Sequence, residues 1–119
     1  MVHAKHSPAK LKNVISELIR CGDPTLNNAA SRLGMSPRSL QRRLEAQAIT
    51  YSDIVDEVRH EIARSLLAST GLDVAEVGAT LGYRDPSSFS RAFMRWSGMS
   101  PRQFRNSTQN SDAYKAINR

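Results

Sequence analysis

The chain has 119 residues, of which 39% are apolar and 24% charged, with a formal net charge of +6 and a pI near 10.1. This length and apolar content predict one compact domain, or two very small ones that share a core, and argue against a disordered chain. The sequence has no apolar run near the roughly 18 residues of a membrane span, no signal-peptide core and a single cysteine, Cys21. We therefore expect a soluble protein of a reducing compartment, the cytosol.

Helix-capping residues followed by proline, and glycines placed where an apolar helical pattern stops, divide the chain into seven predicted helices. The first helix is predicted over residues 8–20, after a cap at Ser7, and carries a full core-facing apolar stripe. Thr25 caps a short second helix, Gly34 makes a turn, and Ser36 caps a third helix predicted over residues 37–47. This succession of a helix, a turn and a second helix is the outline of a helix-turn-helix.

A long helix is predicted next, over residues 51–69, and the earlier pattern then returns. Asp73 caps a short helix, Gly82 makes the turn, and Asp85 with the proline after it opens another helix. The last helix is predicted to be short, over residues 101–105, with a polar, frayed tail after it. No segment shows the sustained alternation of a strand, so the predicted fold class is all-α.

An internal repeat relates the two helix-turn-helix patterns. AASRLGM aligns with VGATLGY at an offset of 48 residues, and SPRSLQRRL aligns with DPSSFSRAF at an offset of 49. Ala30 and Gly78 take equivalent places where closely crossing helices leave little room for a side chain. The predicted organisation is a first helix-turn-helix subdomain (1–50), a linker helix (51–70), a second helix-turn-helix subdomain (71–106) and a polar C-terminal tail (107–119).

Positive charge gathers on the second helix of each unit. Residues 36–50 carry three arginines and one glutamate, and residues 84–105 carry five arginines and one aspartate. The connecting residues 51–83 carry six acidic residues and two arginines. A protein that binds a polyanion needs its cations on one side, whereas a solvated surface mixes its signs. A 19-residue linker helix would be about 28 Å long, close to the ~34 Å that separates successive major-groove faces of DNA.

The chain resembles the DNA-binding domain of the AraC/XylS family of bacterial transcription regulators from about Ser7 to Arg105. The matching stretches are AASRLGMSPRSLQRRL, YSDIVDEVR and, above all, VAEVGATLGYRDPSSFSRAFMRWSGMSPRQFR. The resemblance implies that the third and sixth helices enter adjacent major grooves of double-stranded DNA. It also implies a transcription regulator, most often an activator, of the bacterial cytoplasm and nucleoid.

The same resemblance implies which residues contact DNA. Base contacts fall by position on Arg38, Gln41, Arg42, Ser87, Ser88 and Arg91. This agrees with their chemistry, because arginine pairs with guanine, glutamine with adenine, and serine is adaptable. Phosphate contacts are expected from Ser36, Arg43, Arg84, Arg95 and Arg102. Arg105 is a further candidate, and for Arg95, Arg102 and Arg105 the alternative to a phosphate contact is an ion pair within the protein.

Three residues depart from the usual pattern of the family. Ala48 stands where glycine is usual, so a left-handed backbone there would cost on the order of 1 kcal/mol. Met94 replaces a commonly basic residue, and Phe104 a common tyrosine. The family usually adds a separate effector-sensing or dimerising domain, so we expect that this chain is an excised domain of a larger regulator, with a stand-alone regulator as the alternative.

Other classes of function are weighed against DNA recognition. The sequence shows no pattern typical of an active site, because His60 is isolated and neither a phosphate-binding loop nor a metal-ligand pattern occurs. We therefore expect no enzyme activity, cofactor or metal. A protein-interaction module could use the acidic linker helix to bind RNA polymerase or a sensor domain. A non-specific nucleic-acid binder, of RNA or of the nucleoid, would use the same basic face without sequence choice.

Overall fold

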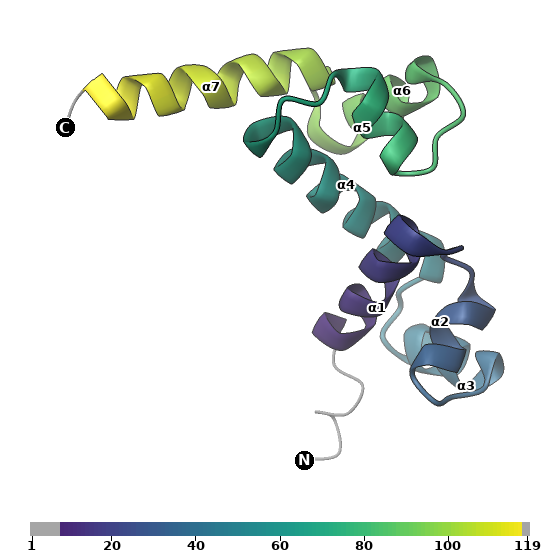
Figure 1. The fold of residues 1–119 in the computed structure, drawn as a ribbon. Helices are drawn as coiled ribbons and strands as arrows, with labels where there is room; N and C mark the ends of the chain where they lie inside the picture. The colour runs from purple at the N-terminus through teal and green to yellow at the C-terminus, as the bar shows by residue number, and fades with distance from the viewer. Residues whose placement is uncertain (1–7, 118–119) are drawn as a thin grey trace. The chain divides into compact units, whose positions relative to one another are not determined.

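The structure, a computed structural model, describes residues 8–117 of the chain and the side chains of residues 9–109. Over this part it contains helices and no strand, which confirms the predicted all-α class (Figure 1). The helices are α1 (Pro8–Cys21), α2 (Leu26–Arg32), α3 (Pro37–Ala46), α4 (Tyr51–Ser69), α5 (Val74–Thr80), α6 (Pro86–Ser97) and α7 (Pro101–Ile117). The predicted capping role of Ser7 lies outside the described residues.

The helices form two compact units that divide within α4. The first unit ends at Arg59 and the second begins at His60. The first therefore contains α1, α2, α3 and the start of α4, and the second contains the rest of α4 with α5, α6 and α7. Each unit holds one helix-turn-helix, formed by α2 and α3 in the first and by α5 and α6 in the second.

The first unit is built on the apolar faces of its four helical segments. Its core side chains are Leu11, Ile15, Leu18, Ile19, Ala29, Ala30, Leu40, Leu44, Ile54, Val55 and Val58. The Tyr51 hydroxyl donates to the carbonyl oxygens of Pro24 and Thr25, each at 3.1 Å, and so joins the start of α4 to the start of α2. Burial raises the pKa of Tyr51 to about 12. Lys12 of α1 also pairs with Glu57 of α4, at 2.6 Å.

The turn between α2 and α3 is a Schellman motif. Gly34 adopts the left-handed backbone with φ of 70°, which glycine reaches without steric cost. Its N–H donates to the Ser31 carbonyl at 3.1 Å, and the Met35 N–H donates to the Ala30 carbonyl at 2.9 Å. These two bonds satisfy carbonyl groups at the end of α2 and turn the chain directly into the cap of α3.

The second unit has an aromatic core. Its buried side chains include Ile62, Ala63, Leu67, Val77, Leu81, Phe89, Ala92 and Phe93. His60 packs edge-on against Phe93, with ring centroids 5.5 Å apart, and lies 5.4 Å from the Trp96 ring. Burial, and secondarily the positive charge of Arg64, lower the pKa of His60. His60 is therefore a core-packing residue of this unit.

The turn between α5 and α6 repeats the hydrogen bonds of the first turn. Gly82, with φ of 94°, donates to the Ala79 carbonyl, and Tyr83 donates to the Gly78 carbonyl, each at 3.0 Å. A Cβ on Gly78 would lie 2.9 Å from the Phe89 Cβ, closer than real side chains approach. The predicted close crossing is therefore confirmed in this unit, and the two units share one backbone design.

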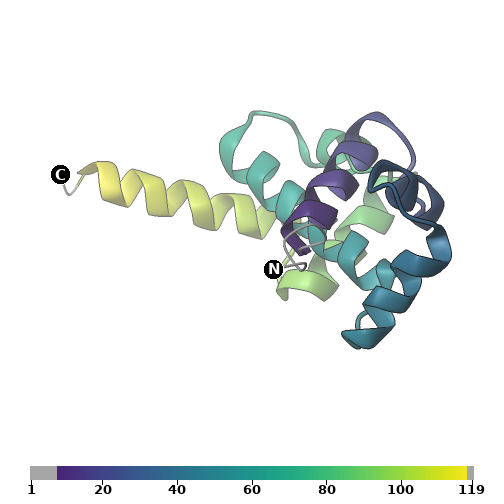
Figure 2. The same ribbon diagram turned by 90° about the horizontal axis from the view of Figure 1, so that it is seen from below.

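The end of α7 differs from the prediction. A last helix ending near residue 105 was expected, but α7 continues to Ile117. Residues 106–117 are polar but contain neither proline nor glycine, so no residue among them breaks the helix that Ser100 starts. Figures 1 and 2 both show this part of α7 extending away from α5 and α6.

Candidate nucleic-acid interface

The start of α3 is fixed by a serine cap. The Ser36 Oγ accepts the Ser39 N–H at 3.1 Å and donates to the Ser39 Oγ at 3.0 Å, and Pro37 occupies the first helical turn. Leu40 and Leu44 are buried, which orients the helix and turns its opposite face to solvent. The three residues predicted to contact bases in this unit all lie on that exposed face: Arg38, Gln41 and Arg42.

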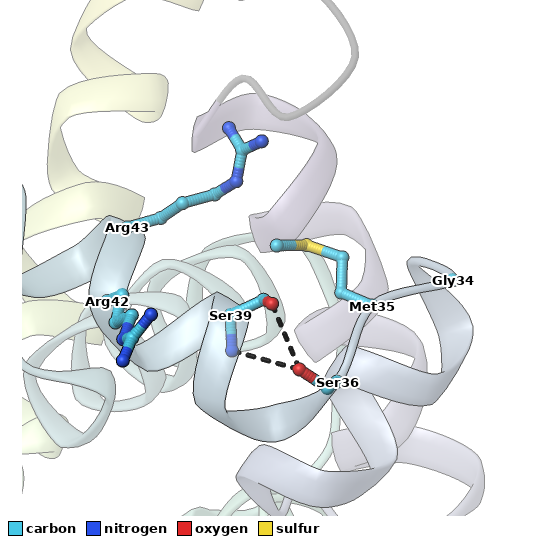
Figure 3. Close-up of a pocket in the computed structure, with 6 residues that line it drawn as sticks. All are labelled: Gly34, Met35, Ser36, Ser39, Arg42 and Arg43. Carbon is cyan, nitrogen blue, oxygen red and sulfur yellow. Dashed lines mark hydrogen bonds between the residues drawn. The ribbon is translucent and has the colours of Figure 1, made fainter.

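Beside this cap the surface is hollowed. The hollow is lined by Gly34, Met35, Ser36, Ser39, Arg42 and Arg43. Figure 3 shows the side chains of Arg42 and Arg43 leaving α3 in different directions, with Ser36 and Ser39 joined at the helix start. The guanidinium groups of these two arginines provide the charge and the donors that bind a phosphate oxygen.

The start of α6 is capped by a carboxylate. The Asp85 Oδ1 accepts the Ser88 N–H at 2.7 Å, and the Ser88 Oγ donates to the Asp85 Oδ2 at 3.2 Å. These bonds, first the backbone N–H and then the hydroxyl, lower the pKa of Asp85. Arg91 reaches the same group, with its Nη2 3.5 Å from the Ser88 Oγ. A negative charge thus stands at the start of α6, where α3 has a neutral hydroxyl.

The predicted base-contact residues of α6 differ in exposure. Ser87 and Arg91 are exposed, whereas Ser88 is half-buried and engaged with Asp85. The repeat offset of 49 residues places Arg91 at the position of Arg42 and Ser90 at the position of Gln41. Ser90 was not among the predicted residues, although the offset in the repeat pointed to it.

The predicted phosphate-contact residues are all on the surface. Exposed side chains are found for Ser36, Arg43, Arg84, Arg95 and Arg102. Arg105 differs, because its Nε donates to the Leu67 carbonyl at 2.9 Å, at the end of α4, and the side chain is half-buried. The hydrogen bond to a backbone carbonyl is a role that the sequence did not predict for Arg105, and its expected ion pair stays a prediction.

A metal site and a membrane span are both missing from the described part of the chain. Among the side chains of residues 9–109, no group of three or more His, Cys, Asp or Glu could hold a metal ion. None of the described helices has both the length and the apolar character needed to cross a membrane.

Comparison with known proteins places the chain in a family. A family model described as a helix-turn-helix domain matches residues 29–107. The ornithine utilization regulator of Pseudomonas aeruginosa is 42% identical over 89 residues, which cover 74% of this chain and 26% of that protein. The chain belongs to the AraC/XylS family of helix-turn-helix regulators. The transcriptional activator NphR of Rhodococcus, another relative, is 34% identical over 104 residues, which cover 87% of this chain and 31% of NphR.

Solved structures share the fold of the chain. A DNA-binding transcriptional dual regulator from Escherichia coli K-12 superposes with a TM-score of 0.79 at 28% identity, covering 87% of this chain and 92% of that one. A transcriptional regulator from Chromobacterium violaceum, described as having an AraC-type DNA-binding domain, shares the fold with a TM-score of 0.77 at 20% identity, covering 91% and 96%. The chain spans about a quarter of the length of the first curated relatives it matches, 26% and 24%.

Proposed function

We propose that this AraC-type domain binds a specific double-stranded DNA site made of two half-motifs and thereby regulates transcription. The observation that carries the proposal is the duplicated arginine, Arg42 on α3 and Arg91 on α6, exposed at the same position of two capped second helices. An arginine at this place can pair with the O6 and N7 atoms of guanine in the major groove. The regulators in the same family support the same role.

We assign a separate set of proposed base contacts to each helix-turn-helix unit. Arg38 and Arg42 are proposed to read guanine and Gln41 to read adenine in one half-motif. Arg91, with Ser87 and Ser88, is proposed to read the other. Phosphate contacts that position the two helices are assigned to Ser36, Arg43, Arg84, Arg95 and Arg102. These contacts would carry no sequence information but would supply much of the affinity at low salt.

The two recognition helices are proposed to occupy adjacent major grooves. The 19 residues of α4 give it a length of about 28 Å, comparable with the ~34 Å repeat of the groove. One chain would then do what a dimer does for helix-turn-helix proteins that carry a single unit.

Activation is the proposed direction of regulation, and NphR is itself named as a transcriptional activator. RNA polymerase is the proposed protein partner, and Asp53, an exposed acidic residue of α4, supports this proposal. A separate effector-sensing or dimerising domain is proposed from the family pattern, and so is a cytoplasmic site of action at the nucleoid. That the chain has no enzyme activity stays a prediction.

Selection from a randomised duplex pool tests the proposed function. Duplexes of about 30 base pairs are enriched on the protein, and the winner is titrated against a scrambled duplex at two salt concentrations. We expect two enriched motifs about ten base pairs apart, with preference over the scrambled duplex retained at the higher salt. No enrichment, with affinity for both duplexes falling equally as salt rises, would contradict the proposal and leave a non-specific nucleic-acid binder.

A further inference from the structure

One apolar side chain stands out on the recognition surface of the second unit. Met94 of α6 is 47% exposed and is the large hydrophobic side chain left on the surface among the described residues. Its apolar neighbours on the same helix, Phe89, Ala92 and Phe93, are at most 2% exposed. Met94 therefore belongs to the solvent face of α6 and makes no part of the core.

The helical spacing places Met94 on the same face of α6 as Ser87 and Arg91, at one edge of that set of residues. Met94 follows Ser87 by two helical turns and lies only ~20° from it around the axis, and it is ~60° from Arg91. Arg95, also exposed, lies ~40° from Arg91 on the side away from Met94. DNA that runs along this face past Ser87 and Arg91 therefore also approaches the Met94 thioether.

The chemistry of DNA limits what Met94 can contact there. A thioether carries no charge and is only a weak hydrogen-bond acceptor, so it offers a phosphate oxygen neither an ion pair nor a donated hydrogen bond. The major groove presents one apolar group, the C5-methyl of thymine. Methionine is unbranched and polarisable, so it adapts to a small apolar partner. The flanking arginines also make this face unsuited to an apolar protein patch, which would need several neighbouring hydrophobic side chains.

We propose that Met94 packs against a thymine methyl group in the half-motif read by α6 and so specifies a thymine at that base pair. The inference rests on the proposed function and adds a specificity-determining residue to it. The repeat sharpens the inference, because the equivalent position on α3 is Glu45, an exposed carboxylate that cannot make this contact. The methyl contact is therefore confined to one half-motif.

Deoxyuridine provides a test that changes only the methyl group. Each thymine of the selected duplex is replaced in turn, and the half-motif read by α6 is identified by its sensitivity to Arg91→Ala. We expect the parent protein to lose about fourfold in affinity at one thymine of that half-motif, the value for one buried methyl group. Met94→Ala should bind the thymine duplex about fourfold more weakly and show no further loss with deoxyuridine.

Two variants separate this contact from a general effect. Met94→Leu keeps an apolar side chain and should retain the preference for thymine, whereas Glu45→Ala, at the matched position of α3, should leave the deoxyuridine penalty unchanged. Because Met94 is exposed, each variant should keep the parent's thermal unfolding midpoint, which confirms the fold. The inference alone would be overturned if Met94→Ala lost as much affinity as the parent when each thymine is replaced by deoxyuridine. It would also be overturned if the selected half-motif contained no thymine. Failure to select any motif would overturn the proposed function and the inference with it.

Discussion

Ala48, two residues after the end of α3, adopts a backbone conformation that suits glycine. Its φ is 57°, and it occupies the left-handed position of a Schellman motif. The Ala48 N–H donates to the Glu45 carbonyl and the Ile49 N–H to the Leu44 carbonyl, each at 2.9 Å. These bonds hold the residue in place although its methyl group is strained there. The departure from glycine noted in the sequence therefore has a structural cost.

Replacing Ala48 by glycine should stabilise the protein. The left-handed strain is removed, and part of the gain is offset by the greater freedom of glycine in the unfolded chain, so we expect the free energy of unfolding to rise by about 0.5 kcal/mol. Urea denaturation followed by circular dichroism would measure it. Gly34→Ala is the matched control, because a Cβ there meets no atom within 4 Å while φ is 70°. The strain, partly offset by the lower freedom of alanine in the unfolded chain, should lower the free energy of unfolding by about 0.5 kcal/mol. A lower midpoint for Ala48→Gly would contradict this account.

The helices show where sequence reasoning succeeds. The cap residues Thr25, Ser36, Asp73 and Asp85 were all identified from the sequence, because capping requires a short polar side chain followed by a helical apolar pattern. The bounds predicted for α4 are the observed ones. The prediction of where α7 ends was wrong, because a segment of low helix propensity that lacks proline and glycine does not stop a helix.

The candidate site was only partly predictable from the sequence. The exposed arginines of α3 and α6 could be placed because the buried residues of each helix fix its orientation. The engagement of Ser88 with Asp85 and of Arg105 with Leu67 could not be placed, because charge and spacing do not reveal a hydrogen-bond partner distant in sequence or a competing cap. Repeat alignment could have found Ser90, but only the structure gives the exposure of Met94.

Arg105 and Arg102 lie in the first turns of α7 but should act differently. The Arg105 Nε donates to the Leu67 carbonyl in the last turn of α4, where a positive charge also favours the helix C-terminus. Arg105→Ala should lower the free energy of unfolding by about 1.5 kcal/mol and leave the salt dependence of DNA binding unchanged. Arg102→Ala should leave stability unchanged and reduce the slope of log affinity against log salt by about one. Urea titration and binding at several salt concentrations would measure both, and a reversed pattern would show that the roles are exchanged.

At the scale of the whole chain, a net charge of +6 is distributed unevenly along the sequence. The arginines of α3 and α6 are exposed, whereas exposed acidic residues lie on α4. Charge of this kind draws the chain to DNA of any sequence and speeds association at low salt. Under the proposed function, selectivity comes from two small sets of base contacts, and joining them in one chain multiplies their effect because the second binding event becomes intramolecular.

This linkage predicts how the two units contribute to affinity. A duplex with both half-motifs should be bound about 100-fold more tightly than a duplex with either half-motif scrambled. Arg42→Ala should cost about 2 kcal/mol on the complete duplex but almost nothing on a duplex that keeps only the half-motif read by α6. Arg91→Ala should show the converse, because each variant removes a base contact from one unit and leaves the other unit intact. Fluorescence anisotropy with the three duplexes measures all of these affinities. Equal losses on every duplex would reduce both arginines to phosphate contacts. A parent that loses affinity when one half-motif is scrambled but not when the other is would read DNA through a single unit, and equal affinity for all three duplexes would mean that neither half-motif is read.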